Sequence, residues 1–286
     1  MTEEERIDQE LEQVLGSVGI PPRPTILMEL DAEAGKDEPN FRKIEQLVSS
    51  DVGLSAALLK TVNSPFYGLR NKASTISQAV SVLGLTALTR TVTGLMLRQT
   101  FSKPGQIDME RFWDASAKVA KVTSHIARKL PGLSKDEAYT FGLFQDCGIP
   151  VLMQKYPDYK QTLGIANQAI DRKFTSAEDE RHQTNHATIG YLLAKSWNLP
   201  KNLCSAIRFH HDFDLISEPH SILPTESQNL IALTLLAERV IQLHSGMSVS
   251  AEWHKGGEAA LQHLGLSHEE FEEILDDAGA LLDQKD

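Results

Sequence analysis

One aspartate and three histidines, far apart in the sequence, are the side chains of this chain best suited to chemistry. Asp146 lies in the otherwise apolar run Phe141–Pro150, and three histidines follow it on predicted helices: His186, His210 and His211. A buried carboxylate is costly unless it is paired, hydrogen-bonded or bound to a metal. Carboxylates and imidazoles from separate helices are typical of a metal site inside a helical bundle. Asp146, His186 and His210 are therefore candidate metal ligands.

The same side chains can instead form a hydrogen-bonded cluster, in which the carboxylate orients an imidazole without any ion. Gln145 directly precedes Asp146, and its neutral amide is a poor ligand for the transition metals that imidazoles select. His210 and His211 are adjacent, so on a helix at most one of them should face the cluster. We therefore expect a hydrogen-bonded cluster with no metal and no cofactor, and the metal site is the alternative.

The elements that position these side chains are predicted to be helices, and the chain is predicted to be all-α. Apolar residues recur at helical spacing, and no segment shows the alternation of a strand. One predicted helix begins after Ser176, carries His182 and His186, and ends near Asn198; His182 is expected at a solvent-exposed edge. Gly84 is expected to end a short helix. Helix-capping residues are predicted at four positions: Asn40, Asp51, Ser134 and Ser267.

Composition narrows the class of protein. The chain has 286 residues, 41% of them hydrophobic and 23% charged, with a net charge of -11. These values are ordinary for a globular protein, and the negative charge argues against general coating of DNA. No apolar run approaches the roughly 20 residues of a membrane span, and the acidic N-terminus is not a signal peptide. Cys147 and Cys204 show no metal or redox spacing, so we expect buried, reduced thiols in a cytoplasmic protein.

One segment reverses the charge of the chain. From Val52 to Ile107 the sequence has no aspartate or glutamate, although the chain as a whole is acidic. The basic residues of this segment are Lys60, Arg70, Lys72, Arg90, Arg98 and Lys103. Such a run forms either an ordinary solvated surface or a site for an acidic partner, a phosphorylated domain, a nucleotide or the acidic tail of the chain. Phe66 and Tyr67, in a turn of the same segment, either pack against the helices or contact a partner.

Several motifs together carry a family resemblance. In the first half they are Leu58–Gly68, which ends in Asn-Ser-Pro-Phe-Tyr-Gly, Thr75–Val80 and Leu83-Gly84. In the second half they are Phe112-Trp113, Gly142–Gly148, His186 with Gly190, Trp197–Pro200 and His210-His211. With these motifs the sequence resembles the HD-related output domain, HDOD, a bacterial signalling relative of the HD and HD-GYP phosphohydrolases. The resemblance covers roughly residues 17–245.

The resemblance implies an N-terminal helical subdomain packed on an HD-like helical bundle. The best internal boundary is Ser102–Gly105, a short polar segment with proline and glycine. The predicted parts are an N-terminal helix (1–18), the N-terminal helical part of the HDOD domain (19–105), the HD-like bundle (106–245) and acidic C-terminal helices (246–286).

The resemblance also implies a degenerate site. Catalytic HD proteins carry an early histidine, a His-Asp doublet, later histidines and a last aspartate. Here the early histidine falls at about Ala115, the histidine of the doublet at Gln145 and the last aspartate at about Glu238. The remaining positions match the pattern: Asp146, His186, His210 and His211.

These departures favour a non-catalytic module of bacterial signal transduction that regulates by binding a protein or a ligand. Two alternatives remain open. One is a metal-dependent phosphohydrolase with a degenerate site, which would need a metal to activate water and hold phosphoryl oxygens. The other is a nucleotide- or nucleic-acid-binding regulator. We expect an unidentified protein partner of a signalling pathway, an acidic or nucleotide ligand on the basic segment, and no membrane.

Overall fold

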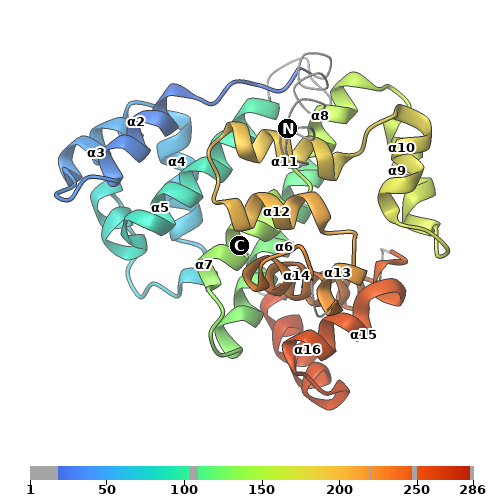
Figure 1. Cartoon of the computed structure of the whole chain (residues 1–286). Helices are drawn as coiled ribbons and strands as arrows, with labels where there is room; N and C mark the ends of the chain where they lie inside the picture. Colours follow the sequence, from blue (N-terminus) through green and yellow to red (C-terminus); the bar gives the residue numbers. More distant parts are fainter. Residues whose placement is uncertain (1–18, 103–108, 219–220, 247–249, 284–286) are drawn as a thin grey trace. The chain divides into compact units, whose positions relative to one another are not determined.

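The computed structural model of this chain describes residues 19–102, 109–218, 221–246 and 250–283. Over those residues the regular secondary structure is helical and no strand occurs, so the predicted all-α class is confirmed (Figure 1). The predicted N-terminal helix (1–18) lies outside the described residues, as does most of the predicted boundary at 102–105. Contacts divide the described residues into two compact units: residues 22–102 form one, and residues 19–21 together with the described residues from 109 to 283 form the other.

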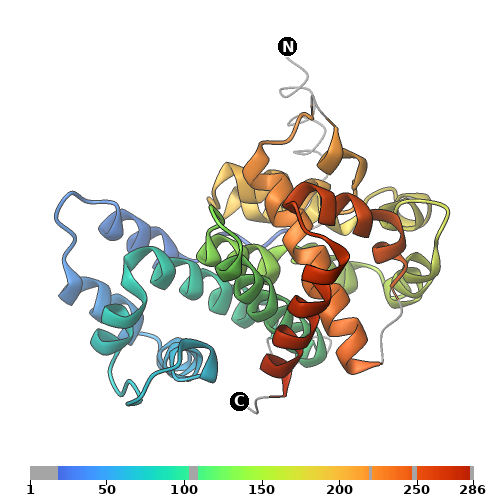
Figure 2. The same cartoon turned by 90° about the horizontal axis from the view of Figure 1, so that it is seen from below.

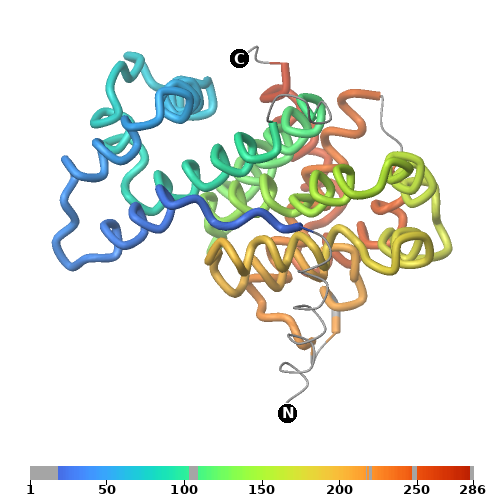
Figure 3. The backbone as a smooth tube through the Cα atoms, turned by 90° about the horizontal axis from the view of Figure 1, so that it is seen from above, coloured from blue at the N-terminus to red at the C-terminus, as the bar shows by residue number. Residues whose placement is uncertain are grey.

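The N-terminal unit is built around one long helix. Its elements are α2 (Thr25–Ala34), α3 (Phe41–Ser49), α4 (Val52–Val62), the short 3-10 helix η1 (Pro65–Tyr67) and α5 (Ile76–Phe101). Helix α5 contacts α2, α3 and α4 (Figure 3). Asn40 and Asp51 cap α3 and α4 as predicted, because their side chains accept hydrogen bonds from Lys43 and Leu54 backbone N–H groups. Gly84 has a φ of 72° and kinks α5, where the sequence predicted a helix end.

Helix α5 is also long and apolar enough, by length and composition, to cross a membrane. The expectation that no segment approaches that length was wrong, because threonines and glycines lie among the apolar residues of α5 and Arg90 and Arg98 are its only charged residues. In the structure α5 packs within its unit, and its side chains Leu88, Val92 and Leu97 are each 0% exposed.

The C-terminal unit is built around α14 (Thr225–Ser245). The other helices of this unit are α6 (Glu110–Lys129), α7 (Lys135–Phe144), α8 (Gly148–Lys155), α9 (Tyr159–Gln168), α10 (Phe174–His182), α11 (His186–Ser196), α12 (Lys201–Phe209), α13 (Asp214–Ser217), α15 (Glu252–Leu264) and α16 (His268–Leu282). Helix α14 contacts α6, α7, α12, α13, α15 and α16 (Figure 2). Every residue from Leu230 to Ala237 is buried, which is typical of a helix surrounded by its neighbours.

Two features of this unit decide where the candidate site residues lie. The single helix predicted after Ser176 was wrong: Gln183 adopts a left-handed φ of 56° and ends α10, and Asn185 caps α11 by accepting from the Thr188 N–H. Helices α8 and α11 contact each other closely at Gly148, where an added Cβ would lie 2.1 Å from the backbone oxygen of His186. Only glycine fits there, so the turn that holds Asp146 lies directly against the start of α11.

Candidate functional site

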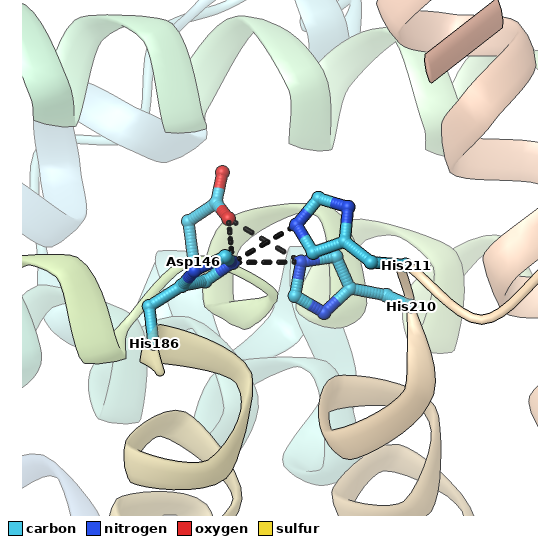
Figure 4. Close-up of side chains that lie close together, drawn as sticks. All are labelled: Asp146, His186, His210 and His211. Atoms are coloured by element: carbon cyan, nitrogen blue, oxygen red, sulfur yellow. Dashed lines mark hydrogen bonds and ion pairs between the residues drawn. The ribbon is translucent and has the colours of Figure 1, made fainter. Parts of the chain in front are cut away.

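Four side chains from three places in the C-terminal unit converge, and we call them the Asp–His cluster: Asp146, His186, His210 and His211 (Figure 4). Asp146 lies in the turn between α7 and α8, and His186 is the first residue of α11. His210 and His211 follow the end of α12. One nitrogen or oxygen of each side chain lies within 4.8 Å of those of the other three.

Both adjacent histidines face the cluster, so the prediction that at most one would do so was wrong. His186 Nε2 lies 3.2 Å from His210 Nε2 and 3.0 Å from His211 Nε2. Helix α12 ends at Phe209, and the backbone turns immediately afterwards, so the separation of neighbouring side chains on a continuous helix does not hold there. The ring of His211 also stacks on Phe174, with 4.5 Å between centroids and 5° between planes.

Each imidazole is held from behind through its Nδ1 atom. His186 Nδ1 lies 2.7 Å from Glu178 Oε2, His211 Nδ1 lies 2.6 Å from Glu252 Oε2, and His210 Nδ1 lies 2.7 Å from the Ile207 carbonyl oxygen. Carboxylate and carbonyl oxygens only accept, so each Nδ1 donates and each Nε2 is directed at the centre of the cluster.

The sequence did not predict the two carboxylates that bond the Nδ1 atoms of the histidines, those of Glu178 and Glu252. Glu178 is fully buried and also accepts from the N–H of His186, while Glu252 is 4% exposed and pairs with Lys255. No local pattern indicates them, since Glu178 reaches His186 across the turn between α10 and α11. Glu252 lies 41 residues after His211.

Burial and neighbouring charges shift the pKa values of three cluster side chains, those of Asp146, His186 and His211. Burial opposes ionisation of Asp146, but hydrogen bonds from His186 and His210 outweigh it and lower the pKa of the carboxyl below its ordinary value of 3.8. Burial would also lower the pKa of His186, yet the charge of Glu178 and the bonds to Asp146 and Glu178 raise it to about 10. Burial and the charge of His210 lower the pKa of His211 to about 4. His186 is therefore protonated at neutral pH and lies between two carboxylates.

Two of the three altered positions, Gln145 and Glu238, form a hydrogen-bonded pair beside the Asp–His cluster. Gln145 Nε2 donates to Glu238 Oε1 at 2.6 Å. Burial, and then the charge of Asp146, raise the pKa of Glu238 to about 8, so this carboxyl keeps its proton at neutral pH. Ala115, Glu238, Asp146 and His211 line a cavity of about 310 Å³. The three altered positions thus carry a neutral amide bonded to a neutral acid, and a methyl group on the cavity wall.

His182 lies outside the cluster, and the prediction that it is a solvated edge residue was wrong. It is 9% exposed, its Nε2 lies 2.9 Å from Thr162 Oγ1, and its ring stacks on Tyr156. Because α10 ends at His182, this ring turns toward α9 instead of following the helix that carries His186.

The sequence profile of the HDOD domain family matches residues 20–213. The chain belongs to the HDOD family. A crystal structure of an HDOD domain protein of Geobacter sulfurreducens is 22% identical, with a TM-score of 0.71 over 98% of this chain and 95% of that one. A protein of Shewanella amazonensis SB2B, named as a candidate phosphohydrolase, is 21% identical, with a TM-score of 0.69 over 96% of this chain and 93% of that one. These two likenesses show the fold.

Curated relatives of this HDOD chain are longer than it is. An uncharacterized protein of Treponema pallidum (strain Nichols) is 28% identical over 238 residues, which is 79% of this chain and 43% of that protein. The uncharacterized protein YuxH of Bacillus subtilis (strain 168) is 30% identical over 101 residues, 35% of this chain and 24% of that protein. The chain therefore spans less than half the length of the curated relatives that it matches.

The candidate partner-binding residues all lie in the N-terminal unit of the HDOD chain. Four of its basic residues are exposed, Lys60, Arg70, Lys72 and Arg98, and Arg90 is half-buried. Phe66 and Tyr67, which were expected either to pack against the helices or to contact a partner, are both half-buried and meet edge to face, with centroids 5.0 Å apart.

The Asn-Ser-Pro-Phe-Tyr-Gly motif closes a loop. The Asn63 side chain bonds both the N–H and the C=O of Ala73, at 2.7 and 2.8 Å. Gly68 has a left-handed φ of 59°, which favours glycine. The conformation of the loop thus accounts for the first and last residues of the motif.

Proposed function

We propose that this HDOD chain is a non-catalytic regulatory module of bacterial signal transduction, acting in the cytoplasm by binding a protein or a ligand. The observation that carries the proposal is the Gln145–Glu238 pair, which occupies positions where catalytic HD proteins have a histidine and an aspartate. Metal-dependent phosphoryl transfer needs a metal that activates water and clamps phosphoryl oxygens. An amide already bonded to a protonated carboxyl, beside the methyl group of Ala115, supplies neither function.

The test is a turnover assay on purified protein, with cyclic dinucleotides and nucleotide phosphates as substrates and Mn²⁺, Mg²⁺, Fe²⁺ or Ni²⁺ added. We expect no hydrolysis above the background of the Asp146→Ala variant. Metal-dependent hydrolysis that Asp146→Ala abolishes would favour the phosphohydrolase alternative instead.

For the partner, we propose an acidic protein surface or a nucleotide that contacts the basic segment of the N-terminal unit. Arg90 and Arg98 lie eight residues apart on α5 and so project from nearby faces of one helix. Attraction between exposed charges decays over about 10 Å at 0.1 M salt, so this binding should weaken as salt rises.

Reversal of both arginines, Arg90→Glu with Arg98→Glu, should weaken binding of the recovered partner while circular dichroism stays unchanged. Lys160→Glu with Lys201→Glu is the matched control, because it changes the net charge equally at exposed positions in the other unit. Equal loss of binding in both double variants would show only a general charge effect and would contradict the proposed surface.

A further inference from the structure

We propose that the cavity of the C-terminal unit binds a small monocarboxylate, with its carboxylate on Arg239 and its apolar body against the surrounding helices. The cavity of about 310 Å³ is lined mainly by residues of α6, α8, α9, α10, α14 and α15. Ligand pockets typically combine apolar walls with a few well-placed polar groups. The biological role of such a ligand rests on the proposed function, because a regulatory module responds to a signal. The binding itself requires neither a metal nor catalysis.

Apolar side chains from several helices form much of the cavity wall. They include Val119 of α6, Leu163 of α9, Phe174 of α10, Ile241 of α14 and Trp253 of α15. If each non-hydrogen atom takes about the 30 Å³ of a water molecule in the liquid, the cavity has room for about ten of them. A carboxylate with a short apolar chain is of that size.

Arg239 is held in place from two sides. Its Nη1 donates to Gln242 Oε1 at 2.8 Å, and Gln242 Nε2 donates to the Ser250 carbonyl oxygen at 3.4 Å. The guanidinium carbon lies 5.6 Å from the centre of the Trp253 ring, which is within the range of cation–π attraction. A charged group that is oriented before binding loses less conformational entropy when the ligand arrives.

The Trp253 ring that supports Arg239 is itself fixed by packing. It stacks on Phe271, which is 4% exposed, with 4.9 Å between centroids and 17° between planes. A Cβ added at Gly257 would lie 2.8 Å from the ring, so the ring lies close against its own helix. The Ala251 N–H donates to the Asn167 carbonyl oxygen at 3.2 Å, which joins the start of α15 to α9. The support for Arg239 is therefore built by α9, α15 and α16 together.

The charges that line the cavity leave one cation unpaired. The acidic side chains of the lining each have a partner in the chain: Lys255 for Glu252, His186 for Asp146 and Gln145 for Glu238. The half-buried Arg239, in contrast, has no carboxylate within ion-pair distance among the residues that the structure describes. A charge removed from water is costly unless it is paired, so an anion in the cavity would stabilise this guanidinium.

A carboxylate suits this guanidinium better than a phosphate does. The planar N–H fork of an arginine matches the two oxygens of a carboxylate in a bidentate pair. In the described part of the chain Gln242 accepts from Nη1, and no acceptor is bonded to the parallel Nε–H and Nη2–H. A monoanion balances the single charge of Arg239, whereas a phosphate dianion would add a second negative charge to a cavity that already holds Asp146 and Glu252.

The experiment measures ligand binding to the full chain by isothermal titration calorimetry, without added metal. The ligands are linear carboxylates from butanoate to dodecanoate, and the comparison compounds are 1-octanol, octylammonium and inorganic phosphate. We expect one octanoate per chain and an affinity that rises about fourfold for each added CH₂, the usual effect of burying a methylene. This rise should stop near eight carbons, where the chain fills the cavity. The comparison compounds should bind more weakly than octanoate or not at all.

Arg239→Gln should weaken octanoate binding by about 10–100-fold, the effect of losing charge-assisted hydrogen bonds. Arg208→Gln is the matched control and should leave binding unchanged. Arg208 is also half-buried and lies over an aromatic ring, 5.2 Å from the centre of Tyr191, but it does not line the cavity. Val119→Phe keeps the test decisive if Arg239→Gln misfolds. It reduces the volume of the cavity and should shorten the longest carboxylate that binds.

Three results would overturn the proposed site. They are a wild-type chain that binds no octanoate, binding that both cavity variants leave unchanged, and an equal loss of binding in Arg208→Gln. Phosphate binding that is tighter than octanoate binding and depends on Arg239 would overturn the carboxylate as the ligand class. These results do not bear on hydrolysis, which is measured separately. Metal-dependent turnover would refute the proposed function and leave the carboxylate site standing.

Discussion

Replacing Gly148 by alanine tests how the site is assembled. An alanine Cβ at this position would lie 2.1 Å from the His186 carbonyl oxygen and 2.7 Å from the Gly190 backbone nitrogen. Both atoms belong to the backbone of α11, so no rotation of a side chain can relieve the overlap. Helices α8 and α11 must move apart, and the turn that carries Asp146 must move away from His186.

The expected cost follows from this overlap. Overpacking a core costs about 1–3 kcal/mol, and a clash between two backbones belongs at the upper end, near 3 kcal/mol. For a cooperative unit of this size, about 1 kcal/mol shifts the melting temperature by about 2–4 °C, so Gly148→Ala should lower it by about 6–12 °C. The assay is thermal unfolding followed by circular dichroism.

Gly164→Ala is the matched control, since it makes the same chemical change at an exposed position of α9 where an added Cβ meets nothing within 4 Å. Removing a helical glycine there should stabilise the chain by about 0.5–1 kcal/mol. A melting temperature of Gly148→Ala equal to or above that of the wild type would contradict the close approach of α8 and α11. It would also contradict the position of Asp146 that depends on this approach.

Three further predictions concern other parts of the chain. Hydrogen bonds from Lys36 and Lys43 lower the pKa of Glu33 from 4.5 to about 2, so its stabilisation is present above pH 4.5 and is lost as the pH falls through 2. Glu33→Gln should therefore have a lower melting temperature than the wild type at neutral pH. A difference in melting temperature that stays constant on acidification would contradict this. Burial raises the pKa of Cys147 well above its usual range and that of Cys204 to about 11, so neither thiol should react with Ellman's reagent until the chain unfolds. Ser267 closes a capping box at the start of α16, and Ser267→Ala should cost about 1 kcal/mol in thermal unfolding; an unchanged melting temperature would contradict this.

Much of the fold could be predicted from local sequence. Asn40 and Asp51 cap the helices that their positions indicated, Ser267 forms the predicted capping box, and Gly84 breaks the backbone where a helix end was expected. These features depend on residues within one turn of one another. The break at Gln183 could not be predicted, because a glutamine in the left-handed region has no local signature and is held there by the packing of α10 and α11.

The candidate site could be predicted only as a set of residue types. The match to the family pattern placed Asp146 and His186 in one group, and in the structure Asp146 Oδ1 lies 3.3 Å from His186 Nε2. The family pattern did not indicate Glu178 or Glu252, because the residues that bond the Nδ1 atom of a histidine follow no fixed spacing in the sequence. The direction of His211 also depended on where α12 ends, and helix ends are the least certain feature of a sequence pattern.

The central claim is that the altered positions of this HDOD chain leave it without metal-dependent hydrolysis. The most direct test measures phosphodiester hydrolysis by the purified chain while Mn²⁺, Mg²⁺, Fe²⁺ or Ni²⁺ is added in increasing amounts. The account predicts a rate that stays at the Asp146→Ala background at every metal concentration. A rate that rises with added metal in the wild type, and not in Asp146→Ala, would contradict it.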